Sequence, residues 1–199
     1  MLFRSVDGYS EVFLLSNLLS FYEQKKYFIE KKEEIESYNL EKPLLMFVGH
    51  TVSAEGSLTK NDKASISDLG FILQFIDDFF KKEKETIKLI EDILNRESGL
   101  KYKNGRDIFE NSFIYIKQEK YTAEEIYQDM LKEIFNCKGN TKGRLELYDI
   151  KRAEGEVGLR IKGEEKYFGI VNIGDANRFK KHLEERDFAW FMEDEFSES

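Results

Sequence analysis

A run of five apolar residues, 44–48, stands between the only proline of the chain, Pro43, and a Gly-His-Thr turn. A run this short and apolar on every side is typical of a strand buried on both faces of a parallel sheet. Pro43 fits this interpretation, because the first residue of a strand tolerates a missing N–H. In open α/β sheets, ligands gather at the carboxyl ends of the strands, so we expect function at Gly49, His50 and Thr51.

Composition indicates a folded chain with a heavily charged surface. Its 199 residues are 41% hydrophobic and 14% aromatic, enough for one domain with a substantial core. The net charge of −8 argues against broad, non-specific binding to DNA or to an anionic membrane, although a local basic groove is compatible with it. The N-terminus has no signal-peptide pattern, and no apolar run approaches the roughly 20 residues that span a bilayer. We therefore expect a cytoplasmic protein.

Heptad spacing predicts a long helix between residues 10 and 38. A stripe of this length either packs on its own domain or pairs with a partner helix, and both interpretations stay open. The stripe consists of apolar residues spaced seven apart: Leu14, Phe21, Phe28 and Ile35. Leu15, Leu18 and Tyr22 lie beside it.

Three further helices are predicted from apolar spacing. The first follows Ser67 and carries an apolar stripe as far as Phe80, and the second ends near Asn95. The third is the clearest local signal, because Thr122 and Glu125 form a capping-box pattern and the apolar stripe then continues to about Phe135.

Alternating patterns predict the strands in the second half of the chain. Residues 144–150 and 156–162 read as an antiparallel hairpin with its turn at 151–155. Residues 167–173 read as a second buried strand, followed by a short helix capped by Asp175, and 188–192 as a third strand. The buried strands 44–48 and 167–173 would then lie parallel in one sheet, joined by a right-handed crossover.

The order of several segments resembles a known family. The segments are KPLLMFVGHTVSA, SDLGFILQFIDDFF, YFGIVNIGDANRFKKHLEE and EDEFSES, with LLSNLLSFYEQKKYF before them and GRDIFENSFIYIK and LELYDIKRAEGEVGL between them. Together they resemble the start of the second RecA-like domain in superfamily 2 DEAD/DEAH-box helicases related to the restriction subunit of type III restriction enzymes. The resemblance covers most of the chain. It implies an α/β fold: a partial RecA-like parallel sheet with flanking helices, plus an α+β insertion containing a β-hairpin.

This resemblance also implies a domain organisation and a role. Residues 1–199 would be one partial helicase domain, with a lead-in helix at 10–40 and the insertion at 100–166. The sequence has no GxxxxGK[ST] phosphate loop and no DEAH-like acidic box. We therefore expect no cofactor in this chain and no ATPase activity of its own, with ATP and Mg²⁺ needed only by the complete parent protein. The chain would be a fragment or truncated product of an ATP-dependent DNA-restriction motor.

The implied nucleic-acid-binding residues lie at two turns. In such motors the turn after the first strand, here Gly49, His50 and Thr51, contacts the nucleic-acid backbone, and Gly174 and Ala176 follow the second strand. A glycine turn permits close approach, while backbone N–H groups and a threonine hydroxyl bind phosphate. The expected partners are nucleic acid, bound weakly and as DNA in preference to RNA, and the ATP-binding helicase domain or the rest of the parent protein. No membrane partner is expected.

Two other functions remain open. The first is a stand-alone protein-interaction module without nucleic-acid binding, which would use the N-terminal helix or the insertion. The second is a small nuclease, because Asp149-Ile150-Lys151 at a strand end is similar to the D/E-x-K element that presents a carboxylate to a metal. The accompanying acidic residue after a proline is missing, however, since the only proline is Pro43.

Cysteine and histidine usage predicts no metal site. Cys137 is the only cysteine, so it has no internal disulfide partner and is expected to be a small buried apolar residue. The two histidines, His50 and His182, are far apart in sequence and do not have zinc-ligand spacing.

Overall fold

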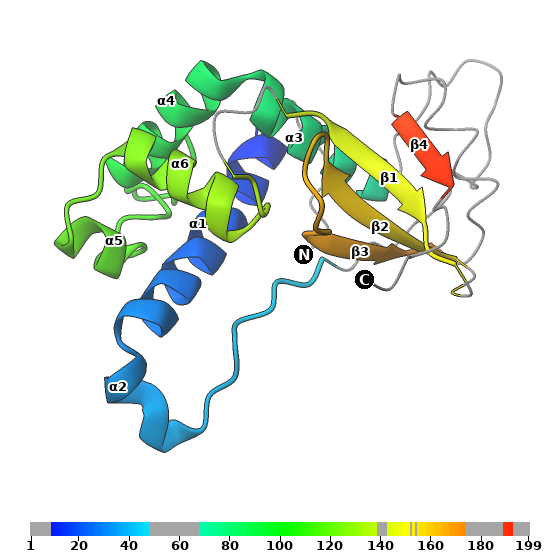
Figure 1. The fold of residues 1–199 in the computed structure, drawn as a ribbon. Helices are drawn as coiled ribbons and strands as arrows, with labels where there is room; N and C mark the ends of the chain where they lie inside the picture. Colours follow the sequence, from blue (N-terminus) through cyan, green and yellow to red (C-terminus); the bar gives the residue numbers. More distant parts are fainter. Residues whose placement is uncertain are drawn as a thin grey trace, which may run out of the picture. The chain divides into compact units, whose positions relative to one another are not determined.

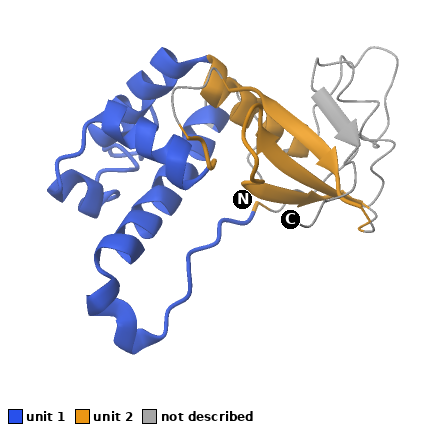
Figure 2. Ribbon diagram, viewed as in Figure 1, with its two compact units in different colours: residues 1–46, 82–134 blue, residues 47–81, 135–199 orange. Residues whose placement is uncertain are grey.

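The computed structural model describes residues 9–47, 68–138, 143–151, 153, 155–173 and 189–192 (Figure 1). The chain divides into two compact units (Figure 2). Residues 1–46 and 82–134 form unit 1, and residues 47–81 and 135–199 form unit 2. The helix predicted after Asp175 lies outside the described residues.

The regular secondary-structure elements in the described part of unit 1 are all helices. Its elements are α1 (Tyr9–Glu30), α2 (Lys32–Ile35), the 3-10 helix η1 (Glu36–Tyr38), α4 (Glu83–Leu94), α5 (Ile114–Gln118) and α6 (Ala123–Glu133). The helical prediction for residues 10–38 is confirmed by the first three. The predicted capping box is also confirmed: the Thr122 hydroxyl accepts the Glu125 N–H at 3.2 Å, and the Glu125 carboxylate accepts the Thr122 N–H at 2.8 Å.

The core of unit 1 forms around one side of α1. Leu15, Leu19 and Tyr22 are fully buried, and α1 contacts α4, α5 and α6. These buried positions adjoin the heptad stripe that the sequence singles out and do not coincide with it. The stripe itself is half-buried at all of its members: Leu14, Phe21, Phe28 and Ile35.

Unit 2 contains a small mixed sheet. Its strands are β1 (Leu145–Asp149), β2 (Glu156–Ile161), β3 (Gly169–Asn172) and β4 (Ala189–Met192), in the spatial order β3-β2-β1-β4. β1 and β2 pair antiparallel, as do β2 and β3, while β4 runs parallel to β1. The predicted hairpin is therefore confirmed, and so is a strand near residues 188–192.

Helix α3 (Asp68–Lys81) closes the core of unit 2 with aromatic side chains. The rings of Phe79 and Phe80 lie 5.1 and 5.0 Å from the ring of Phe135. Gly143 allows close approach, because a Cβ atom there would lie 2.8 Å from the Phe80 ring and 2.7 Å from Ile161 Cγ2. Cys137 is buried, as predicted from its isolation in the sequence.

The predicted partial RecA-like parallel sheet is wrong. Residues 44–47 have no regular secondary structure, and the 167–173 segment contributes β3, which is antiparallel to β2. Residues 162–168 between β2 and β3 are enough for a chain reversal, but parallel strands need a crossover of about a dozen residues or more. Pairing of 44–47 with β3 would in addition close a loop of more than 100 residues, so the local pairing of β3 with β2 is favoured.

Residues 100–166 were predicted to be an insertion in the crossover between those two strands. Because the parallel strand pair does not form, there is no such crossover. Residues 100–166 instead contribute α5 and α6 to unit 1 and β1 and β2 to unit 2. The apolar run at 44–47 has the pattern of a buried strand, which is why a strand was predicted there. A segment forms a strand only when another segment pairs with it, and the pattern does not identify that partner.

A buried carboxylate joins α3 to β1. Asp77 is 2% exposed, its Oδ1 accepts the N–H of Leu145 at 3.1 Å, and its other oxygen pairs with Lys81. We expect Asp77→Ala to lower the free energy of unfolding of unit 2 by about 2–3 kcal/mol, because it leaves the buried Leu145 N–H without its acceptor. Urea denaturation measures this change.

Asp78→Ala is the matched control, because Asp78 is half-buried on the same helix and accepts a bond from Gln74 of that helix. Its expected cost is below about 1 kcal/mol. Equal losses in the two variants would contradict the role given to Asp77.

Candidate functional site

The residues that the sequence singles out for nucleic-acid contact lie outside the described residues: Gly49, His50, Thr51, Gly174 and Ala176. Their role stays a prediction. Asp149 and Lys151, the nuclease candidates, lie at and just beyond the end of β1. Within the described part of the chain, no group of three or more His, Cys, Asp or Glu side chains is placed to hold a metal ion.

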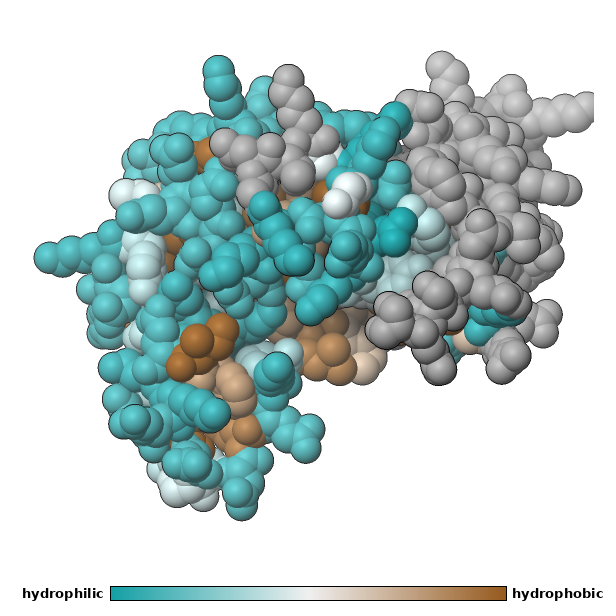
Figure 3. Space-filling model, in the orientation of Figure 1, coloured by the Kyte–Doolittle hydropathy of each residue, from teal (hydrophilic) through white to brown (hydrophobic). Residues whose placement is uncertain are grey.

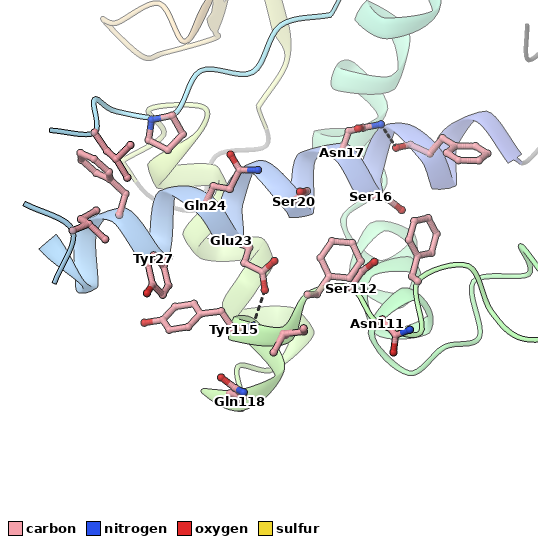
Figure 4. A pocket seen from close by; sticks show the side chains of 18 of the residues that line it. Ser16, Asn17, Ser20, Glu23, Gln24, Tyr27, Asn111, Ser112, Tyr115 and Gln118 are labelled. Atoms are coloured by element: carbon pink, nitrogen blue, oxygen red, sulfur yellow. Dashed lines mark hydrogen bonds between the residues drawn. The ribbon is translucent and has the colours of Figure 1, made fainter. Parts of the chain in front are cut away.

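The structure shows a different candidate, a pocket within unit 1 (Figure 4). Its volume is about 1000 Å³, at the upper end of the range of about 300–1,000 Å³ that is usual for ligand pockets. α1 forms one wall, the segment 109–118 with α5 forms another, and residues 35–43 complete the lining. We call this feature the α1–α5 pocket.

A carboxylate from α1 holds α5 in place. Glu23 Oε1 accepts the N–H of Tyr115 at 2.8 Å and the N–H of Ile116 at 3.3 Å, as Figure 4 shows for Tyr115. These N–H groups belong to the first turn of α5, where no intrahelical acceptor exists. Phe113 precedes the helix in the left-handed region, at φ 59°, and makes no side-chain cap, so Glu23 does the work of a capping side chain.

Aromatic and carboxamide side chains share the lining. The Tyr27 and Tyr115 rings meet edge to face at 5.1 Å, and the Phe109 and Phe113 rings lie 5.9 Å apart. The carboxamides are contributed by α1, by the loop before α5 and by α5 itself: Asn17, Gln24, Asn111 and Gln118. The pocket therefore offers apolar surface together with groups that both donate and accept hydrogen bonds.

Beside the pocket, a polar network ties α1 to α5 and to the residues before α6. The Tyr115 hydroxyl donates to Glu30 at 2.6 Å, and the Tyr121 hydroxyl donates to the same carboxylate at 3.1 Å. Lys26 bridges Glu30 at 3.1 Å and Asp129 at 2.6 Å.

These contacts shift the protonation of the carboxyl groups. Burial works to raise the pKa of Glu30, but hydrogen bonds from Tyr115, Lys26 and Tyr121 outweigh it and hold the pKa below its ordinary value. Burial acts likewise on Asp129, and hydrogen bonds from Lys26 and Tyr22 keep the pKa of that carboxyl low. Both carboxyl groups are therefore ionised at neutral pH and keep their hydrogen bonds there. Through its bond to Tyr115, Glu30 helps to hold the pocket wall in place.

An exposed apolar segment continues from the pocket lining. Pro43 lines the pocket, and the next residues leave Leu44 82% exposed and Met46 71% exposed. Tyr38 and Leu40, earlier in the same stretch, are 72% and 58% exposed. Figure 3 shows apolar surface over the later part of α1 and over this extended stretch. We call residues 38–46 the apolar strap.

Sequence reasoning identified part of this site and missed the rest. It singled out the apolar run at 44–48 and the heptad stripe, of which Phe28 and Ile35 line the pocket. It missed Glu23 and α5, because the contact between them joins residues 92 positions apart. The one available signal was GRDIFENSFIYIK, whose aromatic and aliphatic residues supply much of the second wall.

Comparisons with known proteins add no relative to this picture. No family model, no curated protein and no solved structure matches the chain. Among the described residues, no helix combines the length and the apolar character that crossing a membrane requires.

Acid titration tests the Glu30 anchor. A carboxyl whose pKa is lowered by folding stabilises the fold fully above its ordinary pKa of 4.5, and that stabilisation is lost as the pH falls through the lowered value. We expect Glu30→Gln to be less stable than the parent chain at pH 7, by roughly 1 kcal/mol after solvent screening. The difference should shrink by pH 3.

Glu34→Gln serves as the control, because Glu34 forms only an exposed pair with Lys31 at 3.4 Å. Urea denaturation at pH 7 and at pH 3 measures the free energy of unfolding of the parent chain and of both variants. A Glu30→Gln deficit that is equal at pH 7 and pH 3 would show that the ionised carboxylate is not the stabilising group.

Proposed function

We propose that this chain is a non-catalytic docking component of a restriction- or helicase-type nucleic-acid motor. The resemblance in segment order supports the motor class, and the absence of a phosphate loop and an acidic box from the sequence supports a non-catalytic part. The partner would be the ATP-binding domain of that motor, which would bring ATP and Mg²⁺, and the assembly would be cytoplasmic.

The observation that carries the docking role is the exposure of the apolar strap. Burying a Leu or Met side chain contributes about 1.5–3 kcal/mol, and Leu44 and Met46, which are 82% and 71% exposed, leave most of that contribution unrealised. Contiguous exposed apolar surface marks interaction sites in soluble proteins. A partner surface that covers the strap would recover this free energy on binding.

The nucleic-acid part of the proposal depends on the resemblance alone. The resemblance implies that the two turns lie at the same edge of a parallel sheet, but strands 44–48 and 167–173 do not form that sheet, so a RecA-like sheet in this chain is not part of the proposal. What remains is a weak contact of the nucleic-acid backbone with Gly49, His50, Thr51, Gly174 and Ala176.

A second candidate is a stand-alone protein-interaction module without nucleic-acid binding. The α1–α5 pocket and the half-buried heptad stripe favour it, because neither needs a motor to explain it. The two candidates share the docking surface, so nucleic-acid binding and the identity of the partner separate them.

Substitutions in the strap test docking. If the neighbouring DNA encodes a phosphate-loop domain, we expect Leu44→Asp, and separately Met46→Asp, to weaken binding to that domain by roughly 10- to 100-fold, because each places a charge in an apolar interface. Isothermal titration calorimetry measures the affinities.

Tyr102→Asp is the control, since Tyr102 is 59% exposed elsewhere in unit 1. Equal binding by the parent chain and both strap variants would contradict the docking surface. If no neighbouring reading frame encodes such a domain, the motor hypothesis is wrong and the stand-alone interaction module is favoured.

Gel-shift assays test the nucleic-acid contact. We expect weak binding to DNA that falls as salt rises from low to physiological concentration, because phosphate contacts release counterions. The His50→Ala/Thr51→Ala double variant should bind still more weakly. Equal binding by the double variant and the parent chain would show that His50 and Thr51 do not contact the nucleic acid. No binding at low salt would favour the stand-alone protein-interaction module.

A further inference from the structure

We propose that the α1–α5 pocket binds a peptide segment of a partner protein that carries apolar side chains and at least one Lys or Arg. The inference rests on the proposed docking role and names the chemistry of what is docked. It is carried by three properties of the lining: aromatic walls, carboxamide groups and a one-signed charge.

The aromatic walls provide places for apolar side chains. Tyr27 with Tyr115, and Phe109 with Phe113, form two ring pairs in the lining. Rings of this kind are large and rigid, so they offer contact area at a low cost in conformational entropy. A volume of about 1000 Å³ admits several side chains rather than one.

The carboxamides suit a peptide backbone better than a purely apolar ligand. In Figure 4, Gln24 and Asn17 lie along α1, whereas Asn111 and Gln118 lie on the facing segment. Each carboxamide both donates and accepts, which matches the N–H and C=O groups that every non-proline residue of a bound segment presents.

The charge of the lining selects a basic segment. The carboxyl groups in the lining are those of Glu23 and Glu41, and no Lys, Arg or His side chain is among the lining residues. An acidic lining repels phosphate, so it argues against a nucleotide or a nucleic-acid strand in this pocket. It favours a Lys or Arg placed next to the apolar anchors and disfavours acidic segments.

The exposed part of the lining favours a chain over an enclosed small molecule. Leu40 is 58% exposed and Gln24 and Glu41 are also exposed, although all three line the pocket. A pocket with an exposed edge lets a polypeptide enter and leave, whereas small-molecule sites bury most of their ligand.

The experiment selects ligands for the full chain from a phage library of random 12-residue peptides. We expect the selected peptides to be enriched in Leu or Phe together with Lys or Arg. Fluorescence anisotropy then measures their affinity for the parent chain and for Gln24→Lys, which adds a positive charge to the pocket on an exposed, helix-compatible position. Gln24→Lys should weaken binding by roughly tenfold.

Gln128→Lys is the matched control, because it makes the same chemical change on α6 outside the lining. Its affinity should equal that of the parent chain. Selected peptides without basic enrichment, or equal binding by Gln24→Lys and the parent, would overturn the inference.

The two proposals fail separately. If Leu44→Asp weakens docking of the partner domain while Gln24→Lys leaves peptide affinity unchanged, the pocket assignment is wrong and the docking role stands. If the strap variants and Gln24→Lys are all without effect, both proposals fall.

Discussion

The packing of α1 against α4, α5 and α6 is the interaction on which unit 1 depends. α1 is rich in large apolar residues on more than one side, so its buried side supplies Leu15, Leu19 and Tyr22 to the core and others remain for the surface. Phe28, which is partly exposed, belongs to the second group and lines the α1–α5 pocket. The same helix therefore stabilises the fold and exposes a surface for binding.

Polar contacts decide where that surface is placed. Glu23 fixes the first turn of α5, and Glu30 receives hydroxyl groups of Tyr115 and Tyr121 beside it. Because each of these contacts joins α1 to a segment more than 80 residues away, the pocket wall is a product of tertiary structure. The pKa values of Glu30 and Asp129 lie below their ordinary values, so the stability that these ionised carboxylates contribute to unit 1 is lost as the pH falls through the lowered values.

Local signals in the sequence were reliable guides to the fold. The capping box at Thr122 and Glu125 specifies the start of α6 by contacts within four residues, and the alternating patterns around residues 151–155 specify the β1–β2 hairpin. The parallel sheet failed because it required residues 44–47 to pair with a distant strand, and periodicity holds no information on pairing partners. The pocket could not be predicted for the same reason: the sequence does not show that Glu23 reaches α5.

The exposure of the apolar run at residues 44–47 also supports the proposed docking role. The run that reads as a buried strand is apolar, yet in this chain Leu44 and Met46 lie open to solvent. An apolar segment that its own fold leaves uncovered gains free energy when a partner covers it, which connects the strap to the proposed docking role.

Hydrogen–deuterium exchange of the full chain, read at single amides, tests this account most directly. The account predicts rapid exchange at residues 44–47 in the isolated chain, with slow exchange in β1 and β2 as the internal reference. Slow exchange at 44–47, comparable to that of β1, would contradict it, because it would place these residues in a protected strand and remove the uncovered surface on which the docking role depends.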